Sequence, residues 1–296
     1  MTQPEFQGAI AALLTARKAD GSLDSEGVER SLDHVLDAGA TGVVVAGGTG
    51  EYFDLSIDQR TMLLQQVSAH NAGRGQVIAS NGAARLADCV DLAEHALALG
   101  VDALLLPPPH FYRYGQSDLE DFYRQAAKRI KGPILIYNLA AFCSPIEPET
   151  IARLVESEPN LIGVKDSSGS LASLELLAEQ VPSAVRILGH DRAYVEALRR
   201  KLIHAVISGP AGVVPEISTR LFAADPTSDD FERLAKLFTE VLDQMDPFPY
   251  PWALKFLAQK RGLFEAQVPF APGSARQEQR DELEAWFEEW SDRAGI

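Results

Sequence analysis

The chain alternates short apolar segments with segments of helical periodicity, and this alternation narrows the folds open to it. Eight short runs are apolar on both faces, and most end at glycine, proline or serine. Strands of this kind form parallel sheets that helices cover on both sides. We therefore predict an α/β chain, and eight such units within about 225 residues favour a (β/α)8 TIM barrel. The predicted strands cover residues 8–15, 42–46, 76–80, 101–106, 133–137, 161–165, 185–189 and 204–208.

An open, doubly wound sheet is the alternative arrangement. Such sheets usually have fewer strands and bind nucleotides at an early Gly-x-Gly-x-x-Gly turn. The glycine-rich run in this chain, Gly-Gly-Thr-Gly-Glu at residues 47–51, does not have that spacing. The closed barrel is therefore the favoured fold.

Beyond residue 225 the periodicity becomes wholly helical. Helical segments are expected at 229–245, 252–261 and 275–293, with a proline-rich break at 247–251. No low-complexity linker separates this part from the rest of the chain. We predict a catalytic barrel domain over residues 1–225 and a C-terminal helical appendage, residues 226–296, packed on the barrel.

Charge and composition exclude several classes of function. The formal net charge is −15 and the sequence pI is about 4.8, so nucleic acid and anionic membranes are poor partners. Two cysteines, Cys89 and Cys143, fit a reducing compartment and form no disulfide framework. The N-terminus shows no signal peptide, and no apolar run approaches the roughly 20 residues of a membrane span. We expect a cytoplasmic protein that binds a small molecule.

A lysine closes the predicted sixth strand, at the end where barrels place their active sites. Side chains alternate along a strand, so Gly163 shares a face with Lys165 and is expected to leave space beside its stem. Lys165 either extends to solvent or is buried, and burial would lower its pKa and make it a nucleophile. Tyr137 ends the neighbouring fifth strand. An amine beside a phenol suits imine chemistry on a carbonyl group.

The turn at residues 47–51 follows the second strand and is the expected anion site. Backbone N–H groups in glycine-rich turns suit an anionic oxygen such as a carboxylate. We expect Gly48, Thr49 and Gly50 to contact the substrate there. The chain has neither a His/Cys/Asp cluster at metal spacing nor a phosphate loop of the Gly-x-x-x-x-Gly-Lys type, and we predict no metal and no cofactor.

Other strand ends supply polar candidates. Strands four, seven and eight end near His110, His190 and Ser208 respectively. A histidine at such a position either has a structural role or contacts the substrate. We include all three among the predicted substrate-binding residues.

Four motifs together resemble the dihydrodipicolinate synthase / N-acetylneuraminate lyase family. They are the run at 47–51, Tyr-Asn at 137–138, Gly-Val-Lys-Asp-Ser-Ser-Gly beginning at Gly163, and the tail containing Pro251. The resemblance covers essentially the whole chain in the same order. It implies a barrel with C-terminal helices, a homo-oligomer (tetramer or dimer), and a lyase in which a lysine forms a Schiff base with pyruvate or another 2-oxo acid. Lys165 would be the imine lysine and Tyr137 the proton-shuttling phenol.

The chain departs from the synthase pattern at three positions. Gly48 stands where the resemblance leads us to expect a relay threonine, and Phe111 where it leads us to expect a relay tyrosine. Phe142 stands in place of the arginine that would bind the aldehyde partner's carboxylate. The three differences argue against dihydrodipicolinate synthesis, and the run at 47–51, followed by an aromatic residue and Phe53, resembles that of family members acting on sugar acids. We therefore expect an aldolase or dehydratase that acts on pyruvate or a 2-keto-3-deoxy sugar acid. The alternatives are 4-hydroxy-tetrahydrodipicolinate synthesis, or a catalytically impaired member that binds 2-oxo acids.

Overall fold

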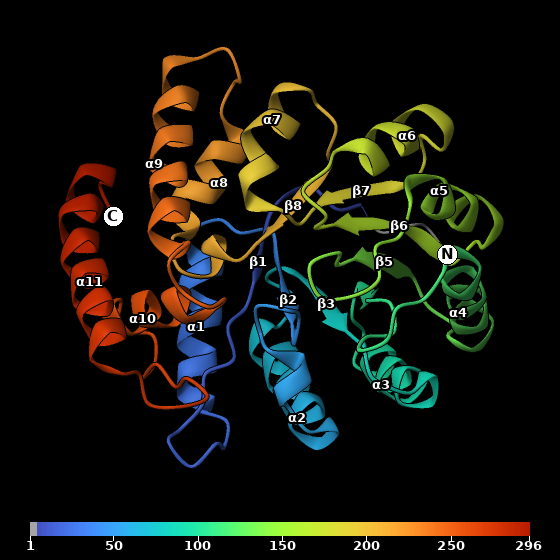
Figure 1. The fold of residues 1–296 in the computed structure, drawn as a ribbon, viewed down its shortest axis with the longest axis horizontal. Coiled ribbons are helices and arrows are strands. Elements are labelled where there is room, and N and C mark those ends of the chain that lie inside the picture. Colours follow the sequence, from blue (N-terminus) through green and yellow to red (C-terminus); the bar gives the residue numbers. More distant parts are fainter. Residues whose placement is uncertain (1–4) are drawn as a thin grey trace.

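The predicted barrel is confirmed in the computed structural model, which describes residues 5–296. The prediction about the N-terminus rests partly on residues 1–4, which lie outside the described residues. Within residues 5–296, eight parallel strands close into a barrel in sequence order, β1 to β8 (Figure 1). The strands are β1 Gly8–Ala12, β2 Gly42–Val45, β3 Gln76–Ser80, β4 Ala103–Leu106, β5 Ile134–Asn138, β6 Leu161–Asp166, β7 Val185–Leu188 and β8 Ala205–Ser208.

Helices follow the strands and surround the barrel, as Figure 1 shows. Helices α1 to α7 each connect one strand to the next parallel strand, and α8 follows β8 and leads into the C-terminal helices α9 to α11. The helices are α1 Ser25–Asp37, α2 Ile57–Asn71, α3 Leu86–Ala98, α4 Gln116–Arg129, α5 Pro148–Ser157, α6 Ala172–Gln180, α7 Tyr194–Arg199, α8 Pro215–Ala223, α9 Asp229–Met245, α10 Trp252–Lys260 and α11 Ser274–Ala294.

Local sequence determines several of the helix ends. Ser56 and Gln59 form a capping box at the start of α2, satisfying two backbone N–H groups that would otherwise lack partners. Helices α5 and α8 begin with proline, whose missing N–H is not needed in the first turn. At α1 the residue at the cap position is Asp24.

The strands are buried on both faces, so the molecule has two apolar layers. Inside the barrel, Ile10, Val44, Ile78, Leu105 and Ile207 belong to one cluster of buried side chains. A second cluster fills the space between the sheet and the helices. This two-sided burial is the physical reason for the unbroken apolar runs in the sequence.

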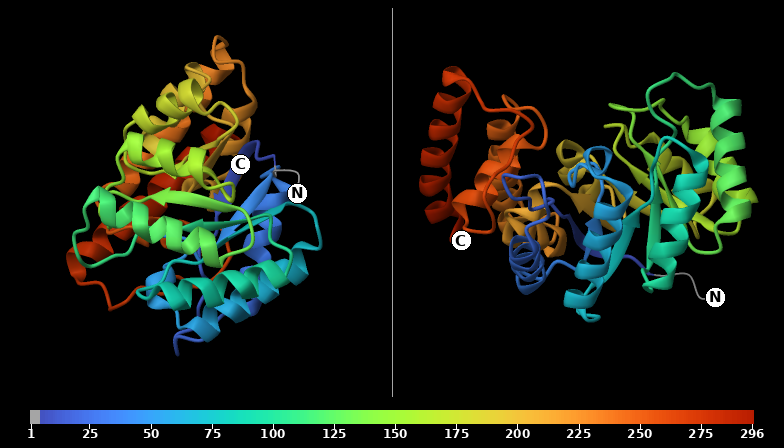
Figure 2. Two further views of the ribbon diagram at one scale, coloured as in Figure 1. Left: turned by 90° about the vertical axis from the view of Figure 1, so that its right-hand side faces the viewer. Right: turned by 90° about the horizontal axis from the view of Figure 1, so that it is seen from below.

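The C-terminal helices pack on one side of the barrel. In Figures 1 and 2, α9 to α11 lie at one end of the molecule, near α1 and α8, and α4 lies at the other end. The Tyr194 ring of α7 packs edge-on against Phe238 of α9, with 5.4 Å between ring centroids. Arg261 at the end of α10 pairs with Glu216 of α8 at 2.7 Å. Within residues 5–296, no helix combines the length and apolar character needed to cross a bilayer.

Candidate active site

A cavity of about 700 Å³ opens where the carboxyl ends of the strands meet. This is the end of the barrel at which (β/α)8 enzymes carry their sites. Its wall combines residues after β2 and β4 to β8 with residues of the C-terminal segment, and it includes Gly48, Thr49, His110, Tyr137, Phe142, Lys165, Ser167, Gly189, His190, Asp191, Gly209, Leu242, Phe248 and Tyr250.

Lys165 lies on the cavity wall near the end of β6. Its side chain is 4% exposed, and burial lowers the pKa of its amine to about 7. Near neutral pH a large fraction of this amine is therefore unprotonated and nucleophilic. The space beside its stem comes from Gly189 rather than Gly163: a Cβ at Gly189 would lie 2.5 Å from the lysine Cε, whereas Gly163 approaches the β7 backbone at Val185.

Tyr137 lies beside Lys165 on the neighbouring strand. The two residues are Cα partners in the β5–β6 register, and the lysine Nζ is 4.4 Å from the centroid of the tyrosine ring. Burial raises the pKa of the Tyr137 phenol well above its usual range, so the hydroxyl remains a proton donor. The nearby Ser167 hydroxyl opposes part of this rise, and it donates a hydrogen bond to the Gly189 carbonyl at 3.0 Å. The amine and the phenol that the sequence places on neighbouring strands thus lie side by side in the structure.

Asp191 is a buried acid that the sequence-based site residues did not include. It follows β7, and burial raises the pKa of its carboxyl to about 6. Ser208 and the backbone of Gly209 hydrogen-bond it, and the positive charge of Lys165 opposes part of the rise. Its position just after the seventh strand could have marked Asp191 as a site candidate. Of this segment, only its neighbour His190 was predicted to bind the substrate.

The glycine-rich turn lies across the cavity from β6 and exposes backbone donors. Ala46 and Glu51 adopt positive φ of 51° and 55° on either side of it. Within residues 5–296, no backbone hydrogen bond engages the N–H groups of Gly48 and Thr49. A Cβ at Gly48 would lie 3.3 Å from the Tyr137 hydroxyl, so the turn passes close to the phenol. The turn can therefore present two donors to an anion beside Tyr137.

Gly50 and Ser208 do not line the cavity, in contrast to the expectation that they contact the substrate. The Gly50 carbonyl accepts a hydrogen bond from Thr15 at 2.7 Å, which ties the turn to the segment after β1. Ser208 is fully buried and hydrogen-bonds Asp191. Both residues therefore lie behind the residues that form the wall.

The two predicted histidines both line the cavity. Within the described residues, the buried Nδ1 atoms of His110 and His190 have no hydrogen-bond partner, and the same holds for Oδ1 of Asp191. Buried polar atoms are normally paired, so three unpaired atoms around one cavity indicate groups that a ligand can satisfy. The His110 ring packs edge-on against Tyr52 at 6.4 Å.

The two phenylalanines at departures from the synthase pattern differ in position. Phe142 is part of the cavity wall, at the outer end of β5. Phe111 is 88% exposed, has a positive φ of 82° and lies away from the wall. Neither side chain can donate a proton or bind a carboxylate.

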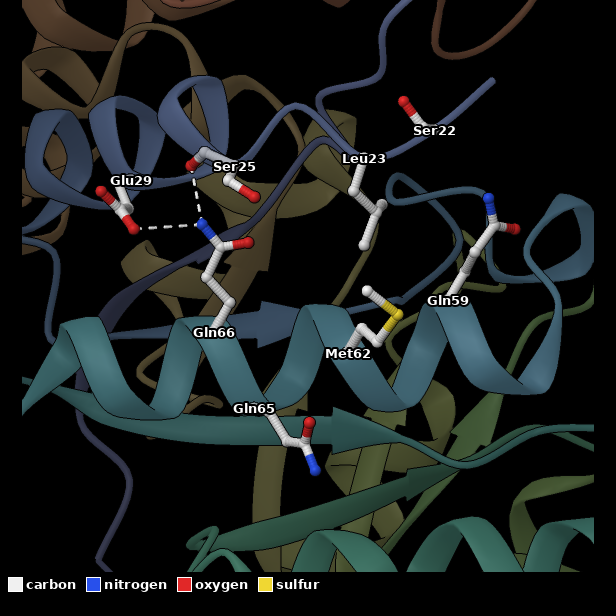
Figure 3. A pocket seen from close by; sticks show the side chains of 8 residues that line it. All are labelled: Ser22, Leu23, Ser25, Glu29, Gln59, Met62, Gln65 and Gln66. Carbon is white, nitrogen blue, oxygen red and sulfur yellow. Dashed lines mark hydrogen bonds between the residues drawn. The ribbon is translucent and has the colours of Figure 1, made fainter. Parts of the chain in front are cut away.

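A second hollow, of about 770 Å³, lies between the N-terminal part of α1 and helix α2 (Figure 3). Its lining consists largely of amides and hydroxyls, and Gln66 donates to Glu29 and to the Ser25 carbonyl across it. It contains no nucleophilic amine. Within residues 5–296, no group of three or more His, Cys, Asp or Glu side chains is placed to hold a metal ion.

Comparison with known families supports the same assignment over almost the full length. The model of the dihydrodipicolinate synthetase family matches residues 5–289. The chain belongs to this family. A family relative, the 4-hydroxy-tetrahydrodipicolinate synthase of Azoarcus sp. (strain BH72), is 31% identical over 274 residues, covering 90% of this chain and 92% of the relative. As a member of the dihydrodipicolinate synthetase family the chain is an enzyme, a lyase.

Solved structures share the fold of this family member. YagE of Escherichia coli K12, solved with pyruvate, superposes with a TM-score of 0.89 at 22% identity, covering 97% of this chain and 99% of YagE. CdNal of Clostridium difficile, solved with mannosamine, gives a TM-score of 0.86 at 19% identity, covering 95% and 99% of the two chains. At these identities the similarity is one of fold.

Proposed function

We propose that this lyase forms a Schiff base between Lys165 and the ketone of a 2-oxo acid, and that its substrate is pyruvate or a 2-keto-3-deoxy sugar acid. The observation that carries the proposal is the buried Lys165 amine, with its pKa lowered to about 7, against the Tyr137 ring in the barrel cavity. A neutral amine attacks a carbonyl carbon, whereas an ammonium group does not.

The proposed chemistry follows from the groups around the amine. Lys165 adds to C2 of the 2-oxo acid, water leaves, and the protonated imine can accept electrons from C3. In aldol cleavage the C3–C4 bond breaks to give an aldehyde and an enamine. Tyr137 relays the proton of the C4 hydroxyl to C3 of the enamine, which becomes the imine of pyruvate. In dehydration Tyr137 relays the proton lost from C3 to the C4 hydroxyl, which leaves as water, and the phenol ends in its protonated form. Hydrolysis of the imine frees Lys165.

The outer cavity supports a hydroxylated substrate. His110, His190 and Asp191 each present a buried polar atom without a partner in the described chain, and sugar hydroxyls would provide partners. A second carboxylate would find little free positive charge there. Arg192 lines the cavity but is already paired with Asp243 and Asp246.

The second candidate function is 4-hydroxy-tetrahydrodipicolinate synthesis, because the Azoarcus relative carries that name. Phe142 in the cavity wall weighs against it, because a phenyl ring cannot bind a carboxylate.

We further propose a cytoplasmic homo-oligomer, dimer or tetramer. Exposed Phe111 and Tyr112 offer an apolar contact surface, and a monomeric mass in sedimentation velocity would refute the oligomer.

Borohydride trapping tests the Schiff base. The wild-type enzyme is incubated with pyruvate, reduced with borohydride and weighed intact, and the modified peptide is identified. We expect one adduct, on Lys165, in the wild type and in the control Lys236→Met, and none in Lys165→Met. An unmodified wild type would contradict the proposal. Release of pyruvate from 2-keto-3-deoxy sugar acids, set against condensation with aspartate semialdehyde, then distinguishes the two candidate functions.

A further inference from the structure

A tyrosine from the C-terminal segment reaches the glycine-rich turn. Tyr250 lies between α9 and α10, 201 positions from Thr49 in the sequence, yet its Oη is 2.7 Å from the threonine Oγ1. Tyr250 as a whole residue is 47% exposed, but its hydroxyl end is enclosed against Gly209, and both Tyr250 and Thr49 line the cavity that holds Lys165. Neither the motifs of the turn nor the spacing of the tail indicates this contact.

Gly209, just beyond β8, provides the space for the tyrosine hydroxyl. A Cβ at this position would lie 2.3 Å from Tyr250 Oη, far inside van der Waals contact, and 3.1 Å from a methyl group of Leu254. Any side chain at 209 would therefore displace the hydroxyl from Thr49. The glycine and the tyrosine form a matched pair.

The protonation of the phenol allows Tyr250 to donate in this hydrogen bond. Burial raises the pKa of Tyr250 far above its usual range, so its hydroxyl keeps its proton. If Tyr250 donates to Thr49, the threonine proton is free to point elsewhere. The backbone N–H groups of Gly48 and Thr49, which donate to no backbone acceptor among residues 5–296, lie in the same turn and the same cavity wall. Together they form a three-donor cradle for one anionic group.

We propose that Tyr250 is a positioning residue that orients the Thr49 hydroxyl towards the carboxylate of the 2-oxo acid, so that the C-terminal segment completes this part of the site. The inference rests on the proposed Schiff-base function. Tyr250 thereby supplies a second hydroxyl to a turn in which Gly48 carries none. Its role is in substrate binding rather than in bond breaking.

Tyr250→Phe tests the role with the ring retained. We expect the pyruvate concentration that half-saturates borohydride trapping to rise about tenfold, the usual scale for a hydrogen bond to a charged group. The trapping rate at saturating pyruvate and the melting temperature should stay close to those of the wild type. Tyr112→Phe is the matched control, since Tyr112 is 68% exposed and lies outside the cavity wall.

Two double-mutant cycles, of Tyr250 with Gly209 and with Thr49, distinguish a positioning role of the Tyr250 hydroxyl from a packing role of its ring. Gly209→Ala should produce the same rise by displacing the Tyr250 hydroxyl, and should add little in the Tyr250→Phe background, because the phenylalanine ring carbon would lie 3.4 Å from the new Cβ. Thr49→Val should also raise the half-saturating concentration. Tyr250→Phe should then have little further effect, because the proposed role acts through Thr49.

The outcomes distinguish the two proposals. Absence of an adduct in the wild type removes the Schiff base and this inference with it. An adduct with equal half-saturation in the wild type and Tyr250→Phe overturns the inference and leaves the Schiff base intact. If Tyr250→Phe has its full effect in the Thr49→Val background as well, the tyrosine does not act through Thr49, and the inference is wrong.

Discussion

Lys165 shows how burial lowers the pKa of a lysine and leaves much of its amine unprotonated near neutral pH. Burial of its amine in the barrel cavity disfavours the charged form, and the negative charge of Asp191 offsets only part of this effect. Because the folded-state pKa of about 7 lies below the ordinary lysine value of 10.5, the unfolded chain binds more protons at this residue between these pH values. This lysine therefore makes folding more favourable as pH rises through that window.

The pKa of Lys165 can be measured by acetic anhydride labelling. We expect acetylation of Lys165 to rise with a midpoint near pH 7, against about 10.4 for a free lysine derivative, because only the neutral amine reacts. Asp191→Asn should move the midpoint lower, because a charge that favours the ammonium form is removed. A midpoint above about pH 9 in the wild type would contradict the account of the nucleophile.

At the scale of elements, helix α10 is fastened to the turn after β2. Lys255 of α10 forms a buried ion pair with Glu51, with side chains 4% and 5% exposed, and also donates to the Gln267 carbonyl at 2.7 Å. Glu51 is the last residue of the glycine-rich run and has a positive φ. The C-terminal helices therefore support the part of the site that carries Thr49, as well as contributing Tyr250.

Breaking this pair should be costly. Lys255→Met leaves the Glu51 carboxylate buried without its cation, and we expect a loss of about 3–5 kcal/mol in the free energy of unfolding. The double replacement Glu51→Leu, Lys255→Met should lose less, since no charge remains buried. Lys260→Met on the same helix removes a more exposed pair with Glu288 and should change stability by less than about 1 kcal/mol. Urea denaturation of the wild type and the three variants gives these free energies of unfolding. Similar losses in Lys255→Met and Lys260→Met would contradict the expected cost of leaving Glu51 unpaired.

On the scale of the whole molecule, the barrel and the C-terminal helices share one cavity. Leu242, Phe248 and Tyr250 line it together with the strand ends. The cavity is therefore lined by residues from both sides of the predicted domain boundary at residue 225. The separation into two domains stays a prediction from periodicity. Arg261 to Glu216 and Tyr194 to Phe238 are further contacts between the two parts.

We expect the two parts to unfold as one cooperative unit. All three tryptophans, Trp252, Trp286 and Trp290, lie in α10 and α11, so fluorescence reports the C-terminal helices alone. Far-ultraviolet circular dichroism reports mainly the barrel. The two probes should give coincident urea midpoints. A fluorescence transition clearly preceding the dichroism transition would show that the helices come off first.

The sequence alone was sufficient to predict the architecture and to place Lys165 and Tyr137 side by side in one candidate site. Strands buried on both faces leave unbroken apolar runs, and the end of each run marks where a side chain meets the barrel cavity. Lys165 and Tyr137 could be identified for that reason, as could the turn that carries Gly48 and Thr49.

Only the tertiary structure decided which neighbours complete the site. The contact of Tyr250 with Thr49 joins residues 201 positions apart, and the space at Gly209 that permits it leaves no periodic trace in the sequence. Gly50 and Ser208 stand at strand ends yet lie behind the wall, because side-chain direction depends on the local turn. Periodicity records which face of an element is buried, whereas the pairing of distant loops is determined only when the barrel closes and the C-terminal helices pack against it.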